Sequence, residues 1–117
     1  PMDIGAFSAD TGEALWSDTL PCCARNADLH GSEVYIASDY FIQIRDVTNG
    51  EVVWEMEPFW HENEVPCHLY PLDNQDLLVN FQFKNKALII NRNDKTIKQV
   101  ITLPEKSNYC FSTCCIY

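Results

Sequence analysis

Two eleven-residue segments align without a gap, and this internal repeat constrains the fold more than any other feature of the sequence. The segments are AFSADTGEALW (6–16) and IRDVTNGEVVW (44–54). In both, glycine stands four residues before tryptophan, with threonine or asparagine before the glycine and glutamate after it. A weaker third copy, IINRNDKTIKQ (89–99), keeps the turn character. Similar segments at an interval of about 40 residues indicate structural units that stack side by side.

Short segments rich in Val, Ile, Tyr and Phe surround these copies, and their alternation favours β-strands. One set of strands is expected at 33–38, 40–45 and 51–57, and a second at 67–72, 76–81, 86–91 and 96–103. No segment shows helical periodicity over three turns or more. The sequence therefore predicts an all-β chain of four-stranded antiparallel meanders, and this unit and period match the blade of a β-propeller.

The strands divide into about two complete blades with flanking strands. The blades are predicted at 24–57 and 67–103, after the closing strands of a preceding blade at 4–17 and before the first strand of a further blade at 108–117. Closed propellers usually have four to eight blades. Three interpretations follow: a piece of a longer propeller, a ring assembled from copies of the chain, or a short variant that closes differently.

The repeated motif, Ala-x-Asp-x-x-Thr-Gly-x-x-x-Trp, resembles the tryptophan-docking repeat of the PQQ-type (quinoprotein-like) β-propellers. The matching residues are Ala6, Thr11, Gly12 and Trp16 in the first copy, and Asp46, Gly50 and Trp54 in the second. Ser8 stands where Asp is usual, and Ile44 and Asn49 replace Ala and Thr. The resemblance implies that the glycine turn joins the last two strands of a blade and that the tryptophan packs between blades. It implies little about function, because most members of this superfamily bind no quinone.

Charge and composition exclude several classes of partner. Seventeen acidic and eight basic residues give a formal net charge of −9, which disfavours nucleic acids and anionic membranes. No apolar run of roughly 18 residues is present, so no membrane insertion is expected. No signal peptide is visible, so a cytoplasmic protein is expected, with a periplasmic or secreted protein as the alternative if a signal has been removed. The cysteines, at 22, 23, 67, 110, 114 and 115, are then expected to be reduced, although a disulfide framework is the alternative.

The densest polar cluster lies in the segment WHENEVPCHLYPL (60–72), which is predicted to be mainly a loop. Its candidate binding residues are Trp60, His61, Glu62, Glu64 and His68. The histidines and glutamates among them, together with Cys67, offer zinc-binding groups, but their spacing fits no zinc pattern, so no metal and no cofactor are predicted. Cys110, Cys114 and Cys115 are expected to be core and surface thiols, because adjacent residues of a strand point to opposite faces.

A non-catalytic scaffold that binds another protein is the function we expect. Loops 17–27 and 58–67 are its predicted contacts, and an acidic, aromatic rim favours a basic or mixed partner surface. The family resemblance implies an enzyme as the alternative. It would be of the quinoprotein dehydrogenase type, with a Cys22–Cys23 disulfide beside the quinone, or of the arylsulfotransferase-like type, with a loop histidine, His61 or His68, at the site.

Overall fold

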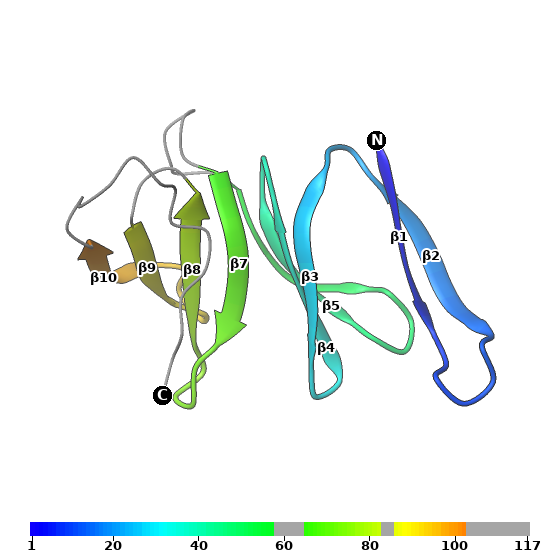
Figure 1. The fold of residues 1–117 in the computed structure, drawn as a ribbon. Helices are drawn as coiled ribbons and strands as arrows, with labels where there is room; N and C mark the ends of the chain where they lie inside the picture. The colour runs from blue at the N-terminus through cyan, green and yellow to red at the C-terminus, as the bar shows by residue number, and fades with distance from the viewer. Residues whose placement is uncertain (58–64, 83–85, 103–117) are drawn as a thin grey trace.

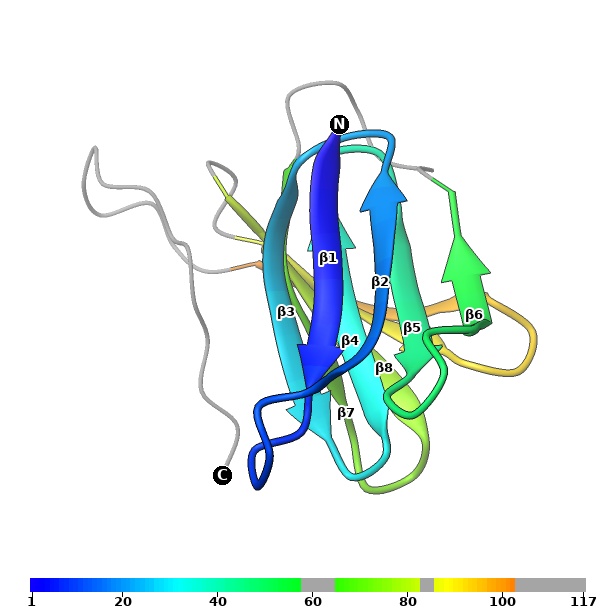
Figure 2. The same cartoon turned by 90° about the vertical axis from the view of Figure 1, so that its right-hand side faces the viewer.

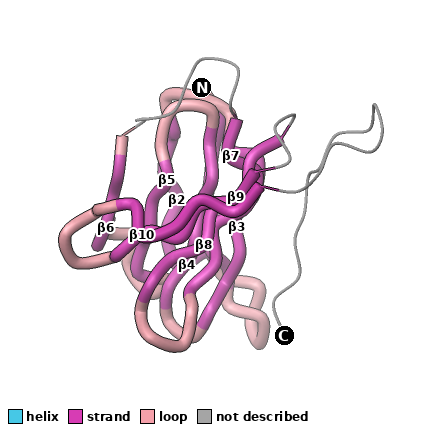
Figure 3. Tube along the Cα trace, turned by 90° about the vertical axis from the view of Figure 1, so that its left-hand side faces the viewer, coloured by secondary structure: helices cyan, strands magenta, loops and turns pink. Residues whose placement is uncertain are grey.

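The structure, a computed structural model, describes residues 1–57, 65–82 and 86–102. Of these residues 67% lie in β-strands and none lies in a helix, which confirms the predicted all-β class. Figure 3 shows the described chain as strands and the turns that join them. None of the described residues forms a helix long and apolar enough to cross a membrane.

Ten strands form three antiparallel sheets, none of which closes on itself in the described part of the chain. The first sheet contains β1 (Met2–Phe7) and β2 (Ala14–Leu20). The second contains β3 (Ala24–His30), β4 (Glu33–Ser38), β5 (Ile42–Asp46) and β6 (Val52–Met56). The third contains β7 (Val65–Pro71), β8 (Asp76–Gln82), β9 (Lys86–Asn91) and β10 (Ile97–Thr102). In each sheet every strand pairs with its neighbour in sequence, and the sheets follow one another in chain order (Figure 1).

The predicted loop at 17–27 is wrong, because most of it is strand. β2 continues to Leu20 and β3 begins at Ala24, so only residues 21–23 connect the first two sheets. β3 lies at the edge of its sheet, where polar side chains are common, and Asn26 donates a hydrogen bond to Asp28 on the same strand. β7 begins at Val65, inside the second predicted loop. Residues 58–64 of that loop and the predicted strand at 108–117 lie outside the described residues.

The larger core lies between the second and third sheets. It forms because alternate residues of each strand point to the same face, so one apolar face of each sheet turns toward the other. The second sheet contributes Tyr35, Ala37, Ile42, Ile44 and Trp54, and the third contributes Leu69, Leu77, Val79, Phe81, Leu88 and Ile90.

A smaller core lies between the first and second sheets. Its buried residues are Leu20, Cys22, Ile36 and Phe41, with Ile4, Ala24 and Val34 packed against them. Figure 2 shows β1 and β2 lying over the second sheet, with β6 extending beyond them. The first sheet is thus too narrow to cover the second completely, and the end of β2 stands over β5 beside an uncovered part of β6.

Candidate functional site

The three segments aligned by sequence adopt the same turn. In the first, the Ser8 amide donates to Glu13 O and the Gly12 amide donates to Ser8 O, both at 2.8 Å. The turn that begins at Asp46 has the same two bonds, each 2.9 Å, and the turn that begins at Asn91 has them at 2.8 Å. The three turns follow β1, β5 and β9, so each joins the last two strands of its sheet.

Polar side chains hold these turns at corresponding places. A side-chain oxygen of the fourth residue accepts a hydrogen bond from the amide two residues later, in the pairs Thr11–Glu13, Asn49–Glu51 and Asp94–Thr96. The fifth residue has a positive φ in all three turns: 74° at Gly12, 77° at Gly50 and 62° at Lys95. Glycine adopts this conformation without steric cost, whereas lysine does not.

Each tryptophan of the repeat contacts the turn of the following sheet. Trp16 Nε1 donates to Val47 O at 2.7 Å, and Trp54 Nε1 donates to Arg92 O at 2.7 Å. Val47 and Arg92 are both the second residue of their turns. We call the contact of the first and second sheets the first junction, and that of the second and third sheets the second junction.

The first junction also brings a glycine directly under an indole. A Cβ added to Gly50 would lie 2.5–2.9 Å from three atoms of the Trp16 ring, so only glycine leaves room for this contact. Beside it, the Arg45 guanidinium lies 5.8 Å from the ring centroid and pairs with Asp18 at 2.7 Å. The hydrogen bond from Arg45 lowers the pKa of Asp18 below its usual value. Arg45 is only 5% exposed, so the first junction encloses a charged side chain.

The second junction has an ion pair at its margin. Arg92 donates to both carboxylate oxygens of Glu33, at 3.0 and 2.7 Å, and the Tyr35 hydroxyl donates to Glu33 at 2.9 Å. The hydrogen bonds from Arg92 lower the pKa of Glu33. Burial, and then the bond to Glu33, raise the pKa of Tyr35.

Of the five predicted rim residues, only His68 lies in the described part of the chain. Its ring stacks on Tyr70, with centroids 5.6 Å apart, and Tyr70 in turn meets the edge of His30 at 6.2 Å. Trp60, His61, Glu62 and Glu64, like Cys110, Cys114 and Cys115, lie outside the described residues. The structure thus joins His68 to aromatic residues of β3 and β7.

Cys22 and Cys23 are free thiols in this structure. Cys22 and Cys67 are buried and Cys23 is exposed. The adjacent pair Cys22–Cys23 is therefore not a disulfide in this structure. Within residues 1–57, 65–82 and 86–102, no group of three or more His, Cys, Asp or Glu side chains is placed to hold a metal ion.

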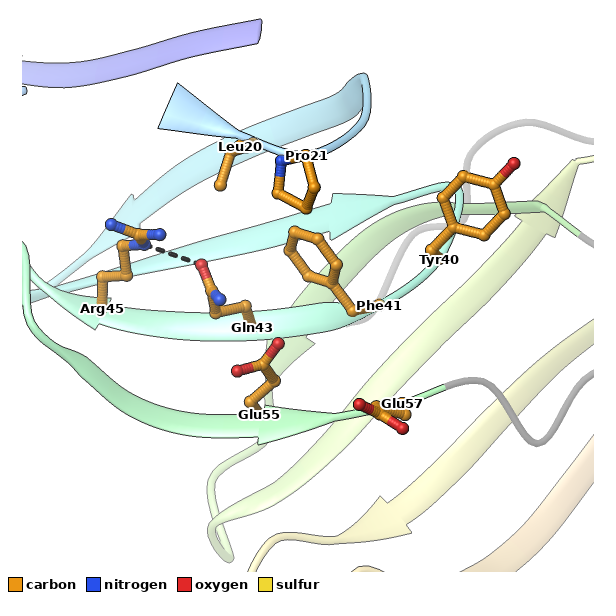
Figure 4. A pocket seen from close by; sticks show the side chains of 8 residues that line it. All are labelled: Leu20, Pro21, Tyr40, Phe41, Gln43, Arg45, Glu55 and Glu57. Carbon is orange, nitrogen blue, oxygen red and sulfur yellow. Dashed lines mark hydrogen bonds between the residues drawn. The ribbon is translucent and has the colours of Figure 1, made fainter. Parts of the chain in front are cut away.

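A pocket of about 390 Å³ lies beside the first junction. It is lined by Leu20, Pro21, Tyr40, Phe41, Gln43, Arg45, Glu55 and Glu57 (Figure 4). The residues come from the end of β2 and the residue that follows it, the β4–β5 turn, β5, and β6 with the residue that follows it. Sequence reasoning missed this pocket. Its one sequence signal is the pair of glutamates two residues apart, which places both carboxylates on one face of the chain.

The sequence matches no protein-family model and no curated protein. Function is therefore inferred from the residues that the structure brings together.

Proposed function

We propose that the protein is a non-catalytic module of the β-propeller type that binds another protein. The three sheets support the propeller type, because they are stacked in chain order and each is fastened to the next by a tryptophan and an equivalent turn. The described residues form three sheets, fewer than the four to eight blades of a closed ring, which favours a module of a larger propeller or of an assembly of chains.

The observation that carries the binding function is the apolar outer face of the first sheet. Trp16 is bonded to the second sheet through Val47 O, whereas the adjacent Leu15, and Phe7 on the paired strand β1, are exposed beside a register shift between β1 and β2. Phe7 is 71% exposed and Leu15 is 48% exposed. Two large apolar side chains on one open face are the kind of surface that a protein partner covers.

The test compares this face with another pair of exposed apolar side chains, on the third sheet. Phe7→Ser with Leu15→Ser removes the proposed contact, and Ile97→Ser with Val100→Ser is the matched control, because those residues are 45% and 55% exposed on β10. Partners are captured by the wild-type protein, purified, and titrated against all three proteins by calorimetry. Light scattering reveals whether the partner is a second copy.

We expect the Phe7 and Leu15 changes to weaken binding by about tenfold or more, and the control changes to alter it less than about twofold. Equal affinities for the wild type and the Phe7/Leu15 variant, with both folded by circular dichroism, would remove this face from the binding function.

A further inference from the structure

The pocket beside the first junction has an apolar side and an acidic side. Leu20, Pro21 and the rings of Tyr40 and Phe41 form the apolar side, and Tyr40 is 66% exposed. Glu55 and Glu57 form the acidic side, and Figure 4 shows Gln43 and Arg45 between the end of β2 and Glu55. A ligand that fills the pocket therefore contacts aromatic rings and carboxylates together.

Gln43 supplies the pocket with a hydrogen-bond donor that no described residue uses. The residue is 4% exposed, and its Oε1 accepts a hydrogen bond from Arg45 Nε at 2.7 Å. This bond fixes the orientation of the amide, because a flipped amide would set its NH₂ group against the Arg45 N–H. Nε2 therefore points away from Arg45 on the side of Glu55 (Figure 4), and among the described residues it has no acceptor. This donor is therefore available to an acceptor on a ligand that fills the pocket.

The two glutamates supply negative charge that the described chain does not neutralise. Every ion pair found within the described residues involves other carboxylates, those of Asp18, Glu33, Asp39 and Asp76. Glu55 and Glu57 are exposed and are separated by one residue, so both can approach one cation. The formal charge of −9 adds a long-range attraction for a positive ligand.

We propose that this pocket binds an arginine side chain on an extended, basic segment of the partner protein. The guanidinium meets Glu55 and Glu57 and stacks on the exposed ring of Tyr40, while a backbone carbonyl of the segment accepts the hydrogen bond from Gln43 Nε2. Arginine fits better than lysine, because its planar group stacks on aromatic rings and its fork of donors serves two carboxylates. The inference rests on the proposed protein-binding function, since the ligand is a segment of a protein.

The experiment titrates the protein with short, blocked peptides that carry one central arginine, lysine or glutamine. Calorimetry at low ionic strength measures the dissociation constants. Glu55→Gln with Glu57→Gln removes the acidic side, and Glu13→Gln with Glu51→Gln is the matched control, because it changes the net charge equally at two exposed positions outside the pocket. Tyr40→Ser tests the stacking without disturbing the core.

The expected order of affinity is arginine, then lysine at least about threefold weaker, then glutamine about tenfold or more weaker. The Glu55/Glu57 variant should lose about tenfold in affinity for the arginine peptide and the Glu13/Glu51 variant less than about twofold. Tyr40→Ser should weaken binding by about threefold or more.

Equal weakening by the two charge variants would show unspecific attraction and would overturn the proposal, as would no binding by the wild-type protein at millimolar peptide. Equal affinity for lysine would overturn the choice of arginine. If the peptides fail while a purified partner still binds in a manner that depends on Phe7 and Leu15, only the pocket inference falls. If the peptides do not bind and the binding of a purified partner does not depend on Phe7 and Leu15, the proposed function is overturned as well.

Discussion

The two junctions share the same hydrogen bond between a tryptophan and a turn, but they differ in the residues that surround it. In each, an indole N–H donates to the carbonyl of the second turn residue of the next sheet, at 2.7 Å. The second junction packs eleven buried residues, Trp54 among them, whereas the first junction has four and leaves Trp16 half-buried. The turn and its tryptophan thus determine how the sheets stack, and the side chains around them determine how stable each junction is.

One pair of corresponding positions explains much of this difference. Arg45 and Ile90 each stand immediately before the first residue of their turn. Ile90 is fully buried in the larger core, whereas Arg45 places a guanidinium between Trp16 and Asp18. A buried charged group is stabilising only when a partner neutralises it, and the partner of Arg45, Asp18, is itself largely exposed. Arg45 therefore contributes less to the stability of the junction than an aliphatic residue does. We therefore expect the first junction to be the weaker one.

Truncation of the two tryptophans should give the largest difference in unfolding free energy between the two junctions. Trp54→Ala removes a side chain that is 9% exposed from the larger core, together with its hydrogen bond, and should cost about 3–5 kcal/mol of unfolding free energy. Trp16→Ala should cost roughly half as much, because the indole is half-buried. Urea unfolding followed by circular dichroism measures both changes. Equal losses would contradict the ranking of the junctions, and a loss below about 1 kcal/mol for Trp54 would contradict its role in packing.

A methyl group added at two equivalent glycines should separate backbone strain from steric conflict. Gly50→Ala introduces a Cβ 2.5 Å from the Trp16 ring at a φ of 77°, and should cost about 2–4 kcal/mol. Gly12→Ala has nearly the same φ, 74°, but nothing within 4 Å of the new Cβ, so it should cost only about 1–2 kcal/mol. The difference between the two unfolding energies measures the indole contact at the first junction. Identical energies would show that Trp16 moves aside freely.

The turns and tryptophans could be predicted from sequence because their chemistry is local. A glycine with positive φ, an oxygen-bearing side chain before it and a tryptophan four residues later occupy fixed offsets along the chain. The pocket could not be predicted in this way. Gln43 and Glu55 become neighbours only through the pairing of β5 with β6, and Leu20 reaches them only through the packing of two sheets. The strand β3 was missed because an edge strand with polar side chains lacks the apolar alternation on which strand prediction depends.

The ion pair of the second junction should make stability depend on acid pH. Arg92 lowers the pKa of Glu33 below its ordinary value of 4.5, so the carboxylate stabilises the fold at pH values above 4.5 and this contribution is lost as the pH falls through the lowered pKa. Glu33→Gln should therefore cost about 1–2 kcal/mol at pH 7 and progressively less below pH 4.5. Urea unfolding of the wild type and the Glu33→Gln variant from pH 7 to pH 3 measures the difference.

The corresponding change at the first junction, Asp18→Asn, should have a smaller effect than Glu33→Gln because Asp18 is 55% exposed. A difference for Glu33→Gln that does not change with pH would show that the pair contributes through packing alone.

The smallest expected effect is a gain in stability at the turn of the third sheet. Lys95 has a φ of 62° where the other two turns have glycine, so Lys95→Gly should relieve backbone strain of about 1 kcal/mol. The lysine ammonium also lies 5.7 Å from the centroid of the Trp54 ring, and its loss removes an exposed cation–π contact of about 0.5 kcal/mol. The net expectation is a rise of roughly 0.5 kcal/mol in unfolding free energy, seen as a small increase in melting temperature. Lys95→Met serves as the control, because it keeps the strained backbone and loses the charge, and should lower stability slightly. A loss on Lys95→Gly as large as that of Lys95→Met would mean that the contact with Trp54 outweighs the strain, so that the second junction owes part of its greater strength to this lysine.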